Sequence, residues 1–191
     1  MVRNVLQATD PRGEAILRRK SSKVRRFDEA LERMVGDMVE TMQASHGVGL
    51  AGPQVGALKR VIVAQLPSEK EEDEQDGPPQ PRPVLALCNP EIHWQSEERE
   101  LGEEGCLSLA GWYGQVPRAH AVKVRYQDLK GRRRKIHAEG FLARILQHEV
   151  DHLQGTLFTD RVEDLTTLVR LTQEGEEPIS LEEVPAGSRD S

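Results

Sequence analysis

The stretch Gln147–Gly155 reads Gln-His-Glu-Val-Asp-His-Leu-Gln-Gly, and it constrains the fold more than any other part of the chain. Apolar residues recur at helical spacing between Leu142 and Leu153, so we expect a helix that begins at Gly140. On such a helix His148 and His152 stand one turn apart on one face, where they can offer two imidazoles to a single metal ion. A packed helix should therefore hold a metal site.

The whole chain has the composition of a soluble globular protein. Its 191 residues are enough for one domain with a core that needs no disulfide. The two cysteines, Cys88 and Cys106, favour a reducing compartment. No apolar run approaches the roughly 20 residues of a membrane span. The net charge of −6 argues against sequence-specific nucleic-acid binding.

The basic N-terminus is the exception to this acidic balance. Residues 1–26 hold eight Lys or Arg against Asp10 and Glu14. A solvated arm is favoured, and a ribosome-facing patch or part of a transit peptide are the alternatives.

Local patterns predict the order of the elements. The apolar spacing of residues 28–44 is that of an amphipathic helix, with Asp28 as its N-cap. Residues 163–171 allow a further, short helix before the acidic C-terminus. Strands are expected at residues 60–66, 83–87, 92–95, 121–126 and 132–137. We expect a catalytic domain over residues 1–173, with an acidic surface loop at 68–82 and an acidic, flexible tail at 174–191.

A catalytic metal normally has three protein ligands, so a third ligand must be found outside the helix. Cys106 is the best candidate, because it follows a glycine in the irregular segment 103–108. The alternative is a buried core thiol, which is the interpretation that we favour for Cys88. His46, beside a glycine turn, is a weaker candidate, and His93, His120 and His137 are weaker still.

The glycine-rich segment Gly47–Gly56 lacks the pattern of a phosphate-binding loop, because no Lys-Ser/Thr follows it. Its glycines allow the backbone to approach an extended substrate, and Gln54 supplies a neutral amide donor. An ordinary loop with an exposed glutamine explains this segment equally well.

Taken together, residues 47–54, 104–108 and 147–155 resemble the three signature motifs of the peptide deformylases, in the order of that family. The resemblance implies an α+β fold, with antiparallel or mixed sheets packed around a central helix that carries the His-Glu-x-x-His motif. It also implies a hydrolase that removes the N-formyl group from the formylmethionine of newly synthesised peptides and releases formate.

The resemblance also implies the roles of the central residues. Cys106, His148 and His152 would bind one divalent metal, natively Fe²⁺, with Zn²⁺, Ni²⁺ or Co²⁺ able to take its place. Such an ion lowers the pKa of a bound water, and Glu149 would move that water's proton to the leaving amine. The Gln54 amide and the Leu107 backbone N–H would donate to the oxyanion.

Other residues are implied to contact or position the peptide. They are Gly47, Val48, Gly49, Glu104 and Arg144. Arg144 is a departure from the family, because many bacterial members have an aliphatic residue at this position near the methionine pocket. Asp151 is expected to support the site structurally or to hold a ligand histidine in its tautomer.

The expected partners are nascent formylmethionyl peptides, with a transient ribosome contact and no membrane. A bacterial cytoplasm is favoured over an organelle. The first motif has Gly52 where the family usually has alanine, which should loosen that loop.

Two other interpretations stay open at this point. A zinc metallopeptidase also uses His-Glu-x-x-His, although a cysteine ligand and the lack of a downstream Glu or His ligand count against it. A metal-binding relative without activity is disfavoured by the presence of Glu149, Gln54 and Cys106.

Overall fold

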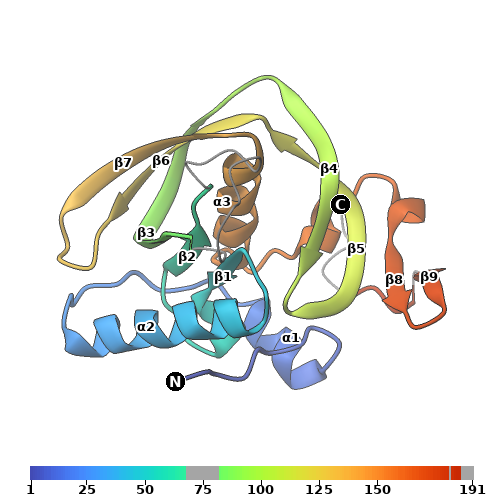
Figure 1. Cartoon of the computed structure of the whole chain (residues 1–191), viewed down its shortest axis with the longest axis horizontal. Helices are drawn as coiled ribbons and strands as arrows, with labels where there is room; N and C mark the ends of the chain where they lie inside the picture. Colours follow the sequence, from blue (N-terminus) through green and yellow to red (C-terminus); the bar gives the residue numbers. More distant parts are fainter. Residues whose placement is uncertain (68–81, 181, 186–191) are drawn as a thin grey trace, which may run out of the picture.

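The computed structural model describes residues 1–67, 82–180 and 182–185 (Figure 1). Over these residues the chain forms three α-helices: α1 (Pro11–Leu17), α2 (Glu29–Ala44) and α3 (Gly140–His152). The predicted acidic loop 68–82 lies outside the described residues, apart from residue 82. In this part of the chain no helix is both long and apolar enough to cross a membrane.

Nine strands form two antiparallel sheets over the described residues. The five-stranded sheet has the order β1-β2-β3-β6-β7, and the four-stranded sheet has the order β4-β5-β8-β9. The strands of the first sheet are β1 (Gly49–Ala51), β2 (Val61–Gln65), β3 (Val84–Gln95), β6 (Ala121–Gln127) and β7 (Arg133–Glu139). Those of the second sheet are β4 (Arg99–Cys106), β5 (Leu109–Ala119), β8 (Val169–Thr172) and β9 (Gly175–Pro178). The α+β expectation is confirmed.

Helix α2 starts and packs as its sequence predicts. The Asp28 carboxylate accepts a hydrogen bond from the Leu31 backbone N–H at 3.0 Å, which satisfies one of the N–H groups left over at a helix start. Val35, Met38 and Met42 are buried against β1, β2 and the first half of β3. The methionine stripe is therefore core packing.

Helix α3 is central in the fold, as Figure 1 shows, and it contacts strands of both sheets. Its residues Ala143, Ile145 and Leu146 pack on the inner face of the five-stranded sheet, where Val122 and Val124 project from β6. Because the helix is covered on two sides, the histidine-bearing turn is held by the core rather than by a loop. This confirms the expected placement of the motif on a packed helix.

Two local expectations differ from the structure. The strands expected at 83–87 and 92–95 are one strand, β3, because register shifts after Cys88 and Ile92 carry the pairing past Asn89, whose φ is +52°. The helix expected at 163–171 is a 3₁₀ turn, Leu165–Thr167, followed by β8. The Asp164 side chain accepts from the Thr166 N–H and caps only this short turn, after which β8 extends the edge of β5.

The C-terminal segment is also more ordered than its acidic composition suggests. The expected boundary at residue 173 falls inside the hairpin of β8 and β9. Beyond it, Ile179 and Val184 are buried in the core formed by the four-stranded sheet. Residues 186–191 of the predicted tail lie outside the described residues.

Candidate active site

Three side chains from two elements converge to form a candidate metal site. Cys106 ends β4 just before a two-residue turn into β5, where it pairs with Leu109. His148 and His152 project from α3. One potential ligand atom from each residue lies within 4.8 Å of the others, and Cys106 Sγ is 3.3 Å from His152 Nε2. The structure thus brings together the three ligands expected from the sequence.

This donor set fits a divalent cation. One thiolate and two imidazoles are ligands for iron or zinc, and three protein ligands leave a coordination position open for chemistry. Burial and the neighbouring His148 lower the pKa of His152, so its imidazole is in the neutral form that binds a metal. His148 Nδ1 is 2.9 Å from Glu104 Oε2, which leaves Nε2 as the ligand nitrogen.

Glu104 is the hub of the ionic network behind His148. Its two carboxylate oxygens accept from both Arg118 Nε, at 2.8 Å, and Arg118 Nη2, at 3.0 Å. Arg144 Nη1 donates to the same carboxylate at 3.0 Å. Although burial alone would raise the pKa of Glu104, the hydrogen bonds from His148 and Arg118 hold it at about 2. The carboxylate therefore stays charged and fixes the His148 ring.

Of the two roles expected for Asp151, the hydrogen bonds of its carboxylate favour structural support over the orientation of a ligand histidine. Its carboxylate accepts from Arg118 Nη1 at 2.6 Å and from Arg161 Nη2 at 2.9 Å. Glu104 performs the orienting role that was expected of Asp151, because β4 places its carboxylate beside the histidine ring. Asp151 instead anchors the far side of the Arg118 guanidinium.

Arg118 was not identified from the sequence. It is only 6% exposed and it bridges the two buried carboxylates of Glu104 and Asp151. The one signal in the sequence was the alternation along β5. Trp112, Val116 and Arg118 are separated by even numbers of residues, so they lie on the same, buried face of the strand. An arginine at an inward position needs acidic partners, but those partners come from β4 and α3, and only the tertiary structure brings them near.

Glu149 is buried next to the metal ligands. It is 4% exposed, and its Oε2 atom has no hydrogen-bond partner among the described residues. Burial raises the pKa of Glu149 to about 7, although nearby His148 acts in the opposite direction. A buried carboxyl with an unsatisfied oxygen beside a metal site has the properties of a general base.

Gln54 lies beside Cys106. Its Oε1 accepts from the Ala51 backbone N–H at 2.7 Å, which fixes the orientation of the amide. Nε2 then lies 3.2 Å from Ser108 Oγ and 3.6 Å from Cys106 Sγ. A neutral N–H donor therefore stands beside the thiolate, next to the turn that contains Leu107.

A cavity of about 700 Å³ opens over these groups. Its lining includes Val48, Gly49, Gln54, Cys106 and Glu149, together with Leu107, Trp112 and the exposed ring of Phe141. The mixture of apolar walls and a few converging polar groups is typical of a small-ligand or peptide site.

Comparisons with known proteins agree on one family. A sequence profile of the polypeptide deformylases matches residues 2–167. The chain belongs to the polypeptide deformylase family. A peptide deformylase of Roseiflexus castenholzii is 47% identical over 177 residues, which cover 91% of this chain and 95% of that protein.

Solved structures of deformylases have the same fold. The peptide deformylase of Thermotoga maritima is 36% identical with a TM-score of 0.72, and the match covers 86% of this chain and 99% of that one. A peptide deformylase from Acinetobacter baumannii, solved with Met-Ala-Ser bound, is 40% identical with a TM-score of 0.72, covering 85% and 99% of the two chains. The chain is therefore an enzyme that removes the N-formyl group from the N-terminal methionine of peptides.

The glycine segment of this deformylase is tightly packed rather than loose. A Cβ atom added to Gly52 would lie 2.6 Å from the Ala57 carbonyl oxygen and 2.7 Å from that of Lys59. At Gly47 the nearest atom would be Leu107 Cδ1, at 2.7 Å. These close approaches, and not a need for flexibility, explain the small residues. The effect of Gly52 on the mobility of the loop stays a prediction.

Arg144 lines the cavity, but its guanidinium is engaged elsewhere. Besides Glu104, it donates to the carbonyl oxygens of Glu100 at 2.7 Å and Val116 at 2.8 Å. The charged end is therefore bound to β4 and β5, and the aliphatic stem is the part left to face the cavity.

The remaining candidate ligands do not join the metal cluster of the described residues. Cys88 is fully buried, and burial raises the pKa of its thiol to about 11, as expected for a core cysteine. His46 lines the cavity with a φ of +54°. His120 and His137 lie at the surface beside Glu100 and Glu139.

Proposed function

We propose that the deformylase reaction of this chain uses one divalent metal, natively Fe²⁺, held by Cys106, His148 and His152. Zn²⁺, Ni²⁺ and Co²⁺ fit the same donor set. The observation that carries the proposal is the convergence of the three ligand atoms within 4.8 Å, beside a buried carboxylate with an unpaired oxygen. When bound, the ion lowers the pKa of a water and polarises the formyl oxygen.

The protein's own groups then move one proton and bind one developing charge. Glu149 accepts a proton at its carboxylate from the attacking water and returns it to the nitrogen of the leaving amine. Gln54 Nε2 and the Leu107 backbone N–H donate to the oxygen of the formyl group as it becomes negative. One such donor contributes roughly 3–4 kcal/mol to the transition state.

The peptide is proposed to lie along the segment Gly47-Val48-Gly49. The side chain of Val48 is 38% exposed at the cavity, and Gly49 continues into the edge strand β1 of the five-stranded sheet. An extended peptide can pair with such an edge through its backbone. Glu104 and Arg144 act on the substrate indirectly, by fixing His148 and the cavity wall.

The similar deformylases of Roseiflexus castenholzii, Thermotoga maritima and Acinetobacter baumannii are bacterial, which supports a bacterial cytoplasm as the site of action. Because the substrates are nascent peptides, we also propose a transient contact of the enzyme with the ribosome.

The test is formate release from formyl-Met-Ala-Ser by protein purified without oxygen, with metal content measured on the same sample. Formate release without cleavage of the internal peptide bonds supports the proposal, and peptide-bond cleavage without formate would refute it. Glu149→Ala should retain the metal and lose nearly all turnover. Retained activity would show that the base is misassigned.

The ligand set is tested with a matched pair of cysteine variants. Cys106→Ser should lose most of its metal, because a serine hydroxyl does not lose its proton to bind a metal as a cysteine thiol does. Cys88→Ser should keep one metal per chain. If only the Cys88 change releases metal, the ligand assignment is wrong.

A further inference from the structure

Among the described residues, one face of the five-stranded sheet is only partly covered. Helix α3 packs on the inner face, and α2 packs on the outer face over β1, β2 and the first half of β3. The outer face continues over the second half of β3, β6 and β7, where Lys123, Arg125, Arg133 and Lys135 are exposed. We call this part the β3–β6–β7 face. In Figure 1 it lies above α2, away from the α3 face that carries the metal site.

An exposed aromatic ring is fixed on this face. Trp94, on β3, is 43% exposed and pairs across the sheet with Lys123, which in turn pairs with His137. Lys123 Nζ is 4.7 Å from the centre of the Trp94 ring, and the His137 ring meets it edge-on at a centroid distance of 6.1 Å. These contacts hold the indole in place while leaving ring surface exposed.

The neighbouring rows place like charges together. Arg125 is directly opposite Lys135, and Arg133 is opposite Gln127. Like charges at directly opposed positions destabilise a sheet. In the described part of the chain, Lys123, Arg125, Arg133 and Lys135 make no ion pair within 4.0 Å, in contrast to the arginines beside Asp128.

Acidic residues on the face do not balance these cations. Glu91 lies opposite Arg125 at the β3 side, and Glu139 lies 3.5 Å from His137 at the β7 side. This excess of positive charge stands in a chain whose net charge is −6.

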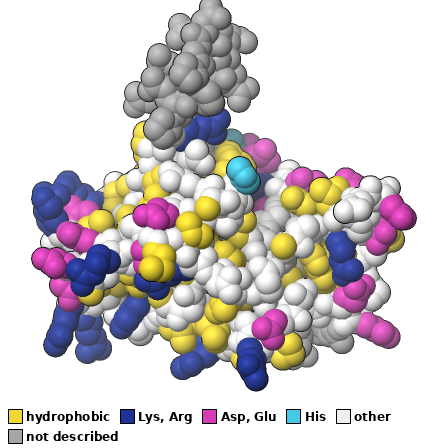
Figure 2. All heavy atoms as spheres, turned by 60° about the horizontal axis from the view of Figure 1, so that its bottom comes forward, with side chains coloured by type: hydrophobic (Ala, Val, Ile, Leu, Met, Phe, Trp, Pro, Cys, Tyr) yellow, Lys and Arg dark blue, Asp and Glu magenta, His cyan; other side chains and the backbone are white. Residues whose placement is uncertain are grey.

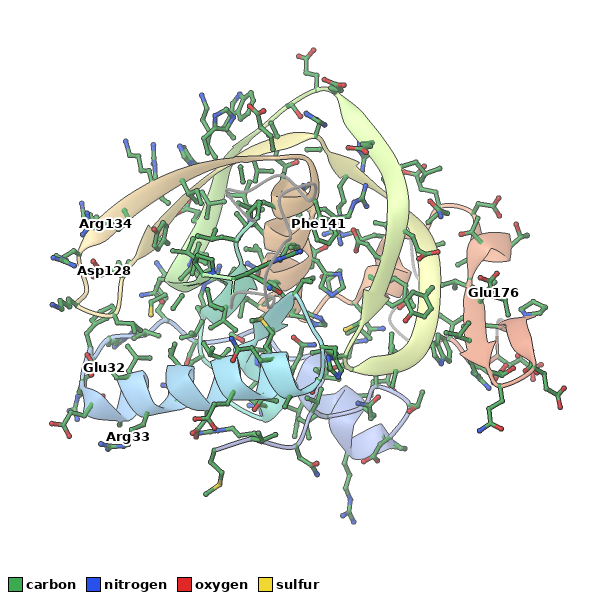
Figure 3. All side chains as sticks on the ribbon, in the orientation of Figure 1. Glu32, Arg33, Asp128, Arg134, Phe141 and Glu176 are labelled. Atoms are coloured by element: carbon green, nitrogen blue, oxygen red, sulfur yellow. The ribbon has the colours of Figure 1, made fainter. Side chains whose placement is uncertain are left out.

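The turn between β6 and β7 extends the positive surface. Residues 130–135 hold five Lys or Arg in six positions. Two further arginines, Arg25 and Arg26, lie just before the start of α2 in the sequence. Figure 3 shows Arg134 and Asp128 at the tip of the hairpin, where they form an ion pair of 3.2 Å. In Figure 2, Lys and Arg side chains gather at the left, the side on which Figure 1 places this turn.

We propose that the β3–β6–β7 face binds a single-stranded polynucleotide, with a base stacked on Trp94 and its phosphates beside Lys123, Arg125, Arg133 and Lys135. Exposed aromatic rings among cations on an antiparallel sheet are a general way to bind single strands, because every base offers a π-face. A duplex hides those faces, and an acidic peptide has no base to stack. The interaction is independent of the deformylase site, which lies beyond the sheet on α3.

The binding is measured by fluorescence anisotropy with labelled RNA and DNA strands of about 12 nucleotides, beginning at about 20 mM salt. Four phosphate contacts predict that log K falls with log salt at a slope of about −3. Trp94→Ala should weaken binding between about 5-fold and about 160-fold, the equivalent of about 1–3 kcal/mol for one stacked base. The double variant Arg125→Gln with Lys135→Gln should reduce the slope by about 1.4. The RNA and DNA arms decide which sugar is preferred.

The matched control removes two positive charges elsewhere. Arg12 and Lys20 are exposed and lie outside the β3–β6–β7 face, so Arg12→Gln with Lys20→Gln should leave the slope unchanged. Deformylase activity, measured on all variants, should stay at the wild-type value and shows that they fold.

Three results would overturn the proposal. They are no binding at the lowest salt, an equal effect of the control pair, and equal binding of duplex or polyglutamate without any dependence on Trp94.

Discussion

Replacing Gly49 with alanine should inactivate the enzyme by moving its base, without removing the metal. A Cβ atom at residue 49 would lie 2.4 Å from Glu149 Oε1 and 2.9 Å from its carboxyl carbon. Ordinary contact begins near 3.4 Å, so the carboxylate must move by about 1 Å. A misplacement of about 1 Å can lower kcat about 100-fold, which is about 2.7 kcal/mol of activation free energy.

The assay is steady-state formate release, with metal content measured in parallel. The metal should remain at one per chain, because a Cβ at residue 49 would contact Glu149 rather than a ligand. Gly36→Ala is the matched control. Nothing lies within 4 Å of a Cβ at Gly36 in α2, so this change should leave kcat unchanged and stabilise the fold by about 0.5–1 kcal/mol.

A double variant tests whether the effect passes through Glu149. If it does, Gly49→Ala with Glu149→Ala should be no slower than Glu149→Ala alone. A kcat within about threefold of wild type for Gly49→Ala would refute the steric reasoning. Additive losses in the double variant would instead assign Gly49 to substrate alignment.

Three further predictions concern stability. Arg118→Met removes the arginine that bridges two buried carboxylates, although Glu104 keeps Arg144 and His148 and Asp151 keeps Arg161. It should lower the free energy of unfolding in urea by about 1–3 kcal/mol, and an unchanged urea midpoint would contradict the network. Gly155→Ala should lower the free energy of unfolding by about 1–3 kcal/mol. The φ of Gly155 is +80°, and the new Cβ would lie 2.3 Å from the Arg18 carbonyl oxygen. An unchanged urea midpoint would contradict this prediction. Although desolvation opposes the shift, hydrogen bonds from Arg132 lower the pKa of Asp128 to about 2, so its stabilisation is complete above the ordinary value of 3.8 and is lost as the pH falls toward 2. Carboxyl NMR titration checks this, and a midpoint near 3.8 would contradict it.

Local sequence patterns predicted the helices α2 and α3, but not the strand β4, which carries Glu104 and Cys106 and whose end was expected to be irregular. The N-cap and apolar spacing of α2, and the helical spacing of α3, are properties of neighbouring residues, so they can be read directly. The errors arose where long-range pairing decides. Residues 84–95 stay in one strand because β6 pairs with both sides of the bulges, and residues 169–178 form a hairpin because β5 offers an edge.

The sequence by itself determined the relative positions of two proposed ligands and the proposed base, since His148, Glu149 and His152 are fixed relative to one another by one helix. It also singled out Cys106 and Gln54 as their partners.

Only the tertiary structure decided how these groups are held. The Glu104–Arg118–Asp151 network joins β4, β5 and α3, and residues that are distant in the chain leave no local pattern to read. The same reason explains the β3–β6–β7 face. The row of Trp94, Lys123 and His137 exists only through the register of three strands.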